Sequence, residues 1–145
     1  MKVRDVMTSN PVSCNAEATL QDVARKMDEI DSGIIPIVEN GQIKGVITDR
    51  DIAIRAVADG ANPGSGKAIT YATQDVKSVS PDMDLEDAAE IMEESMIRRL
   101  VVVENGKLVG MVSLGDVAEC DADEAEDVLI EVSKSEKTLA HKRRD

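Results

Sequence analysis

The sequence predicts an α/β fold made of two similar β-α-β-β-α units that follow one another along the chain. Three observations lead to this prediction: an internal repeat, an amphipathic helix pattern in each copy, and paired apolar runs joined by Asn-Gly turns. A shift of 65 residues places residues 7–53 over residues 72–118 without a gap and gives 14 identities in 47 positions. Because chance identity is about 6% at average composition, we interpret the two segments as copies of one unit.

The first helix of each copy is predicted from the spacing of its apolar residues. Leu20, Val23, Met27 and Ile30 recur at helical spacing, and the second copy repeats this pattern between residues 85 and 96. One residue ahead of each helix stands a side chain typical of an N-cap. These expected caps are Thr19 and Asp84.

In each copy, one strand is expected before this helix and two strands after it. They are expected at residues 11–14, 34–38 and 43–47 of the first copy and at residues 76–79, 100–103 and 108–112 of the second. Asn40-Gly41 and Asn105-Gly106 separate the last two strands of each copy, and Asn-Gly accepts the positive φ angles of a tight hairpin. A second helix is expected from Asp49 and from Leu114.

The repeat also predicts how the chain is divided. A unit of about 50 residues buries too little surface to be stable alone, so the two copies are expected to pack together. The segments that we expect are repeat 1 over residues 1–59, a linker over 60–67, repeat 2 over 68–120, and an acidic C-terminal helix with a polar tail over 121–145.

The composition excludes several functions. The chain carries 17 Lys plus Arg against 29 Asp plus Glu, a formal charge of −12, and its only aromatic residue is Tyr71. Nucleic-acid binders present basic surfaces and often aromatic platforms, so we expect no nucleic-acid partner. One His and two Cys provide neither a zinc cluster nor a disulfide framework, which suits a cytoplasmic location. No stretch approaches the roughly 20 apolar residues of a membrane span.

A motif of the form Gly-x-x-[Ser/Thr]-x-x-Asp ends the last strand of each copy. It places Thr48 and Asp51 in the first copy and Ser113 and Asp116 in the second. A hydroxyl at a strand-to-helix junction lies beside unpaired N–H groups that attract phosphate, and a carboxylate one turn later can accept hydrogen bonds from a ribose diol. The motif therefore indicates a nucleotide site. The alternative, which the sequence leaves open, is that these residues only cap the helix.

The two copies differ in their basic residues. Arg98 and Arg99 precede the central strand of the second copy, where the first copy has uncharged residues. Adjacent guanidinium groups in so acidic a chain suit a phosphate ligand, although surface salt bridges to neighbouring acids are the alternative. In the first copy, Arg50 or Arg55 would have to take this role.

These features together resemble a tandem CBS-domain pair, also called a Bateman module, over residues 1 to about 120. The second copy is similar to the AMP-binding repeats of the γ subunit of AMP-activated kinase. The resemblance implies two repeats related by a pseudo-twofold axis, a homodimer, and an adenine held among aliphatic side chains. The implied ligand-binding residues are Thr48, Asp51, Arg98, Arg99, Ser113 and Asp116, with Ile35, Val12 and Val79 near the adenine.

The expected function is that of a non-catalytic regulatory module without a cofactor or a metal. It would bind AMP, ADP or ATP, or less favourably NAD or S-adenosylmethionine, in clefts between the repeats and signal to a regulated protein by a conformational change. An enzyme is not expected, because the sequence contains no nucleophile–base pair, metal cluster or convergent acid pair. The alternative is a ligand-free dimeric scaffold that acts through its acidic surface and C-terminal helix.

Overall fold

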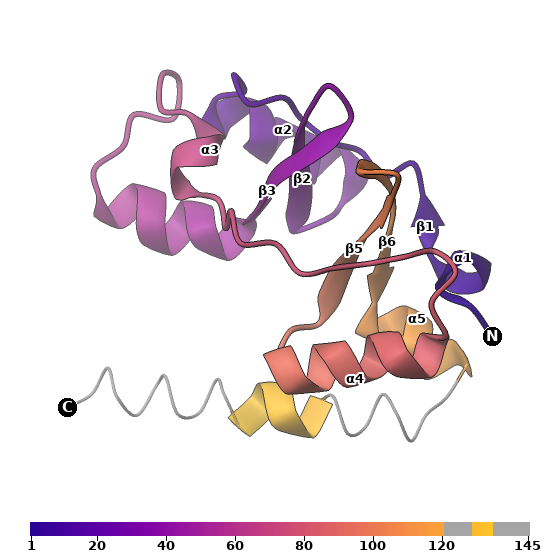
Figure 1. Ribbon diagram of the computed structural model, residues 1–145. Helices are drawn as coiled ribbons and strands as arrows, with labels where there is room; N and C mark the ends of the chain where they lie inside the picture. The colour runs from indigo at the N-terminus through magenta and orange to yellow at the C-terminus, as the bar shows by residue number, and fades with distance from the viewer. Residues whose placement is uncertain (121–128, 135–145) are drawn as a thin grey trace. The chain divides into compact units, whose positions relative to one another are not determined.

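The computed structural model describes residues 1–120 and 129–134, which form two compact units (Figure 1). The repeat-1 unit contains residues 10–76 and 105–108. The repeat-2 unit contains residues 1–9, 77–104, 109–120 and 129–134. Most of the second hairpin therefore belongs to it, although the turn residues 105–108 are grouped with the repeat-1 unit. Both units combine helices with strands, which confirms the mixed α/β class. Within the described ranges, no helix is long and apolar enough to cross a membrane.

The repeat-1 unit is a helix and a hairpin followed by two helical segments. Its elements are α2 (Leu20–Ile30), β2 (Ile34–Glu39), β3 (Gln42–Thr48), the π-helical η1 (Asp51–Ala56) and α3 (Ala68–Tyr71). Asn40 and Gly41 turn the β2–β3 hairpin with φ angles of 54° and 80°, as the sequence predicts. The helical backbone runs from residue 49 to residue 58, with η1 inside it.

The repeat-2 unit contains a four-stranded sheet in the order β1-β6-β5-β4. Its elements are α1 (Val3–Val6), β1 (Thr8–Ser9), β4 (Ser78–Val79), α4 (Leu85–Ser95), β5 (Arg99–Glu104), β6 (Lys107–Ser113) and α5 (Leu114–Cys120). Strand β1 is antiparallel to β6, and β4 is parallel to β5. Asn105 and Gly106 turn the hairpin with φ angles of 54° and 77°.

The expected first strand of each copy is largely absent from the described structure. Residues 11–14 form only one parallel bridge, between Cys14 and Ile37, and of residues 76–79 only Ser78 and Val79 form a strand. Pro11 explains part of this difference, because proline has no N–H to donate to a neighbouring strand.

The helix caps differ between the copies. Thr19 accepts a hydrogen bond from the Asp22 N–H at 3.1 Å, and the Asp22 carboxylate accepts one from the Thr19 N–H at 3.0 Å. This capping box confirms the prediction for α2. Asp84 is the N-cap residue of α4, as predicted, but its side chain makes no cap hydrogen bond.

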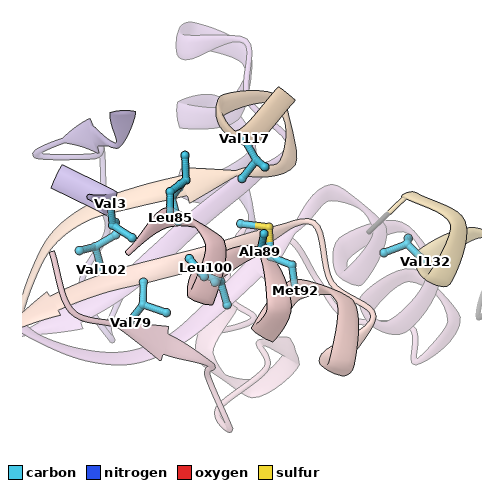
Figure 2. Packing of buried hydrophobic residues seen from close by; sticks show 11 residues of the cluster. Val3, Val79, Leu85, Ala89, Met92, Leu100, Val102, Val117 and Val132 are labelled. Carbon is cyan, nitrogen blue, oxygen red and sulfur yellow. The ribbon is translucent and has the colours of Figure 1, made fainter. Parts of the chain in front are cut away.

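Each unit has its own aliphatic core. In the repeat-1 unit, Leu20 and Val23 of α2 pack with Ile35, Ile37 and Ile47 of the hairpin. The corresponding faces of α4 and of β5 and β6 meet in the repeat-2 unit (Figure 2). The labelled members of that cluster are Val3, Val79, Leu85, Ala89, Met92, Leu100, Val102, Val117 and Val132.

The C-terminal segment is described in part. The predicted acidic helix begins in residues 121–128, which lie outside the described residues, as does the tail over residues 135–145. Residues 129–134 are helical, and Val132 is buried in the repeat-2 core.

Candidate functional site

Thr48 and Asp51 of the repeat-1 motif are joined by two reciprocal hydrogen bonds, in which the side chain of each residue accepts from the backbone N–H of the other. Thr48 is the last residue of β3, and its Oγ1 accepts from the Asp51 N–H at 3.1 Å. The Oδ2 atom of Asp51 accepts from the Thr48 N–H at 3.0 Å. Both side chains are half-buried, so the strand-to-helix junction is fixed by its own side chains.

The repeat-2 motif has the same arrangement. Ser113 ends β6, and its Oγ accepts from the Asp116 N–H at 3.2 Å. The Oδ2 atom of Asp116 accepts from the Ser113 N–H at 2.8 Å. The structure therefore shows the capping role that the sequence left open as an alternative.

This capping role leaves capacity for a ligand. A hydroxyl that accepts one hydrogen bond still has its own O–H to donate, as a phosphate oxygen requires. A carboxylate has a second oxygen that can accept from a ribose hydroxyl. The cap thus holds both groups in a fixed geometry, and a nucleotide contact at Thr48, Asp51, Ser113 or Asp116 stays a prediction.

The two arginines of repeat 2 lie at the same junction as Ser113. The carbonyl of Arg98 accepts from the N–H of Leu114 at 2.8 Å, and Arg99 is the first residue of β5. Both arginine residues are exposed. The structure therefore brings Arg98, Ser113 and Asp116 to one end of the β5–β6 hairpin, as a phosphate-and-ribose site requires.

The matched junction of repeat 1 has no arginine on the strand side. The Asp49 N–H donates to the Gly33 carbonyl at 2.9 Å, which repeats the backbone pairing of Leu114 with Arg98. The Asp49 carboxylate covers Gly33, since a Cβ atom added to Gly33 would lie 2.8 Å from its Oδ2 atom. We did not include Asp49 or Gly33 among the predicted site residues. The sequence already indicated the difference between the two junctions, because Asp49 aligns with Leu114 and Gly33 aligns with Arg98.

The basic residues of repeat 1 lie on the helical side of its junction. Arg50 is exposed, and its N–H donates to the Oδ1 atom of Asp49 at 2.8 Å. Arg55 donates to the carbonyl of Tyr71 at 2.8 Å, and its Nη1 atom lies 3.8 Å from the Oδ1 atom of Asp51. Arg55 thus stands beside the carboxylate that is expected to bind ribose.

The only aromatic side chain belongs to the repeat-1 unit. Tyr71 is half-buried against the repeat-1 core, and its hydroxyl donates to the Asp59 carboxylate at 2.6 Å. This hydrogen bond raises the pKa of Tyr71. The contacts give Tyr71 a structural role in this unit.

The three expected adenine contacts differ in exposure. Ile35 has no exposed surface, and Val79 is 4% exposed. Both pack in the core of their own unit. Val12 is 43% exposed and is available to a ligand. The aliphatic environment of an adenine stays a prediction, and only Val12 presents substantial surface for it.

A cavity of about 290 Å³ lies elsewhere in the repeat-2 unit. Its lining consists of Glu90, Glu93, Glu94, Met96 and Glu131. Four carboxylates repel an anionic ligand, so this cavity does not suit a nucleotide. Among residues 1–120 and 129–134, no group of three or more His, Cys, Asp or Glu side chains could hold a metal ion.

Comparisons with known proteins agree on the family. The model of the CBS domain matches residues 3–57 and 67–123. A CBS domain-containing protein of Bacillus subtilis, YhcV, is 40% identical over 116 residues, which cover 80% of this chain and 82% of that protein.

Two solved structures have the same fold. The crystal structure of Hypoxic Response Protein I, with two coordinated zinc ions, has a TM-score of 0.76 and 30% identity and covers 83% of this chain and 98% of that chain. The CBS domain pair of protein MJ0100, in complex with 5′-methylthioadenosine and S-adenosylmethionine, has a TM-score of 0.74 and 24% identity. It covers 86% of this chain and 98% of that chain.

Proposed function

The chain belongs to the CBS domain family, and from this premise we propose that it is a non-catalytic regulatory module that binds an adenosine nucleotide. The observation that carries the proposal is the junction in which the Ser113–Asp116 capping box lies beside Arg98. It combines a hydroxyl, a carboxylate with an available second oxygen, and guanidinium groups. These are the groups that phosphate and ribose require. The MJ0100 complex supports the proposal because it shows that this fold holds adenosyl ligands.

The second repeat is the stronger candidate for a phosphorylated ligand. The body of the protein is acidic, with a formal charge of −12 for the chain, so an anionic nucleotide needs local positive charge. Arg98 and Arg99 supply it at the repeat-2 junction, while the strand side of the repeat-1 junction carries a carboxylate. The likeness of repeat 2 to AMP-binding repeats of the AMP-activated kinase γ subunit is part of this proposal.

A change in the protein on binding would provide the signal. A nucleotide that bridges Arg98 and Asp116 would connect the start of β5 to the first turn of α5. It would shift the protein between two conformations only if it binds one of them more tightly than the other. We propose that a second protein reads this shift.

We also propose that the protein is a homodimer. Ile54 and Val57 lie on the helical backbone after β3 and are 42% and 67% exposed. Burial of such apolar surface against a second copy is favourable. Size-exclusion chromatography with light scattering measures the mass, and a mass of 15.6 kDa for the particle would contradict the dimer.

Isothermal titration calorimetry of the full chain against AMP, ADP, ATP and adenosine tests the binding function. We expect micromolar binding of at least one nucleotide, lost in Asp116→Ala and weakened about tenfold or more in Arg99→Ala. Lys107→Ala is the matched control, because Lys107 is an exposed cation at the other end of β6, about 20 Å along the strand from Ser113. Failure of well-folded protein to bind any nucleotide would overturn the proposal and favour a ligand-free scaffold.

A simpler measurement precedes calorimetry. With one Tyr and no Trp, the protein contributes little ultraviolet absorbance, so an adenine that copurifies would be visible near 260 nm.

A further inference from the structure

The strand side of the repeat-1 junction is occupied by a fixed carboxylate. The Oδ1 atom of Asp49 accepts from the Arg50 N–H at 2.8 Å. Its Oδ2 and Cγ atoms lie 2.8 Å and 3.0 Å from the position that a Cβ atom on Gly33 would take. The space in which a side chain at residue 33 would begin is therefore filled by negative charge.

The repeat-2 junction has the same backbone with the opposite charge. In both copies, the N–H of the residue after the hydroxyl donates to the carbonyl of the residue that precedes the strand, at 2.9 Å in repeat 1 and 2.8 Å in repeat 2. Repeat 2 has Leu114 where repeat 1 has Asp49, and Arg98 where repeat 1 has Gly33. The matched geometry means that the difference lies in the side chains.

The six matched junction positions carry a net negative charge in repeat 1 and a net positive charge in repeat 2. Repeat 1 contributes Asp49, Arg50 and Asp51, two acids and one base, from positions 33, 34 and 48–51. The matched repeat-2 positions contribute two bases, Arg98 and Arg99, and one acid. Arg55 adds a cation on the repeat-1 side, but its guanidinium is bound to the Tyr71 carbonyl and lies 3.8 Å from Asp51.

We propose that the repeat-1 junction selects an adenosyl ligand without phosphate, whose 5′ substituent is uncharged or positively charged, and that Asp49 determines this choice. The inference rests on the proposed function, since it uses Asp51 as the partner of a ribose. Asp49 is exposed. A phosphate at the position that corresponds to Arg98 would meet its carboxylate, and like charges in close contact repel, the more so where the bound ligand displaces water. A sulfonium or amine there would be attracted instead. The two repeats thus differ in the charge of the 5′ substituent that they accept.

The experiment uses the full chain with the repeat-2 site closed in two ways. Asp116→Ala removes the carboxylate that is expected to bind ribose, and Asp116→Asn removes its charge but keeps an oxygen that can accept from the Ser113 N–H. Each protein, checked for folding by circular dichroism, is titrated with adenosine, S-adenosylmethionine and AMP in a calorimeter. We expect both to bind adenosine and S-adenosylmethionine, and to bind AMP at least tenfold more weakly than either.

Removal of the charge on Asp49 tests its role. Asp49→Asn keeps the size of the side chain and an oxygen that can accept from the Arg50 N–H. In either background, we expect it to raise the ratio of AMP affinity to adenosine affinity about tenfold. Glu39→Gln is the control with the same change of charge. Glu39 is exposed at the opposite end of β2, about 20 Å along the strand from Gly33, and should leave the ratio within twofold.

The outcomes separate this inference from the proposed function. AMP binding as tight as adenosine binding in both backgrounds, or an affinity ratio unchanged by Asp49→Asn, would overturn the role of Asp49. If the wild type binds AMP through Asp116 while both backgrounds bind neither adenosine nor S-adenosylmethionine, the inference is wrong and the proposed function stands. If no protein binds any nucleoside or nucleotide, both are wrong.

Discussion

The two strand-to-helix junctions have the same hydrogen bonds and different charges. The four hydrogen bonds of the two capping boxes, each from a backbone N–H to a hydroxyl or a carboxylate, range only from 2.8 Å to 3.2 Å. The basic residues near the junction lie on the helix in repeat 1 and at the start of the strand in repeat 2. Repeat 1 has Asp49 where repeat 2 has Leu114. The motif by itself therefore forms a cap in both copies, and the proposed difference in ligand depends on the surrounding charges.

The largest expected effect concerns the cores on which the junctions are built. Ile35 and Leu100 are matched residues of β2 and β5 and are 0% and 1% exposed. Replacement of either by Ala leaves a cavity and should lower the free energy of unfolding by about 2–5 kcal/mol. Urea denaturation followed by far-UV circular dichroism measures this loss. Ile35→Val, which removes one methylene, should cost only about 0.5–1.5 kcal/mol.

Equal losses at Ile35 and Leu100 would show that the copies depend alike on their separate cores. A cost below about 1 kcal/mol at one of them would contradict its complete burial, since such a small value is typical of surface positions.

The next effect is a transfer of ligand preference between the copies. Gly33→Arg combined with Asp49→Leu gives repeat 1 the residues that repeat 2 has at these two positions, Arg98 and Leu114. The double change is required because an Arg at residue 33 alone would meet the Asp49 carboxylate. We expect AMP affinity at the repeat-1 junction, measured with Asp116→Ala present, to rise about 10- to 100-fold. If the transferred residues leave AMP affinity unchanged, the charges at these positions do not determine the ligand.

The features that the sequence predicted well are those set by local chemistry. The Asn-Gly turns require positive φ angles that few other residues adopt, and α2 and its Thr19 cap follow from apolar spacing and a capping box. The first strands were not predictable in the same way. Residues 11–14 form one bridge at Cys14, because a short extended segment becomes a strand only through its partner.

The residue types of the candidate site were predictable from the sequence, but the positions of its charged groups in space were not. Alignment of the copies showed Arg98 without a counterpart in repeat 1. The position of the Asp49 carboxylate over Gly33 depends on the pairing of two residues 16 positions apart and on the hydrogen bond to the Arg50 N–H. Neither contact can be read from periodicity. The π-helical geometry of η1, against the α-helical α5, is likewise a property of the packed unit.

A smaller effect is expected for the hydroxyls of the two caps. Thr48→Ala and Ser113→Ala each remove an acceptor for the N–H of the third helical residue, at 3.1 Å and 3.2 Å. Each should lower the free energy of unfolding by about 1 kcal/mol, measured by urea denaturation. Thr48→Ser and Ser113→Thr keep the hydroxyl and serve as controls. If one Ala variant costs much more than the other, the caps are not equivalent and the structural half of the comparison fails.

The smallest effect concerns the helix that precedes each hairpin. The Thr19 N–H donates to the Asp22 carboxylate and lowers the pKa of Asp22, and the hydrogen bond to the Thr19 side chain adds to the shift. A carboxylate whose pKa is lower in the folded state stabilises that state above the pKa of the unfolded chain, about 3.9. This contribution disappears as the pH falls through the lower, folded pKa. Asp22→Asn should therefore destabilise the protein at neutral pH and much less at low pH.

Asp87→Asn is the matched variant in repeat 2, because Asp87 aligns with Asp22. Asp84, the residue that precedes α4, makes no side-chain cap hydrogen bond, so this end of the helix lacks the complete capping box. Asp87→Asn should consequently change stability less than Asp22→Asn at neutral pH, as measured by thermal unfolding across a pH series. Equal effects, or a difference for Asp22→Asn that persists unchanged into strong acid, would show that overall charge rather than the Thr19–Asp22 box is responsible. The Thr19–Asp22 box is thus one of the structural differences between the copies, just as Asp49 is one of the differences in charge.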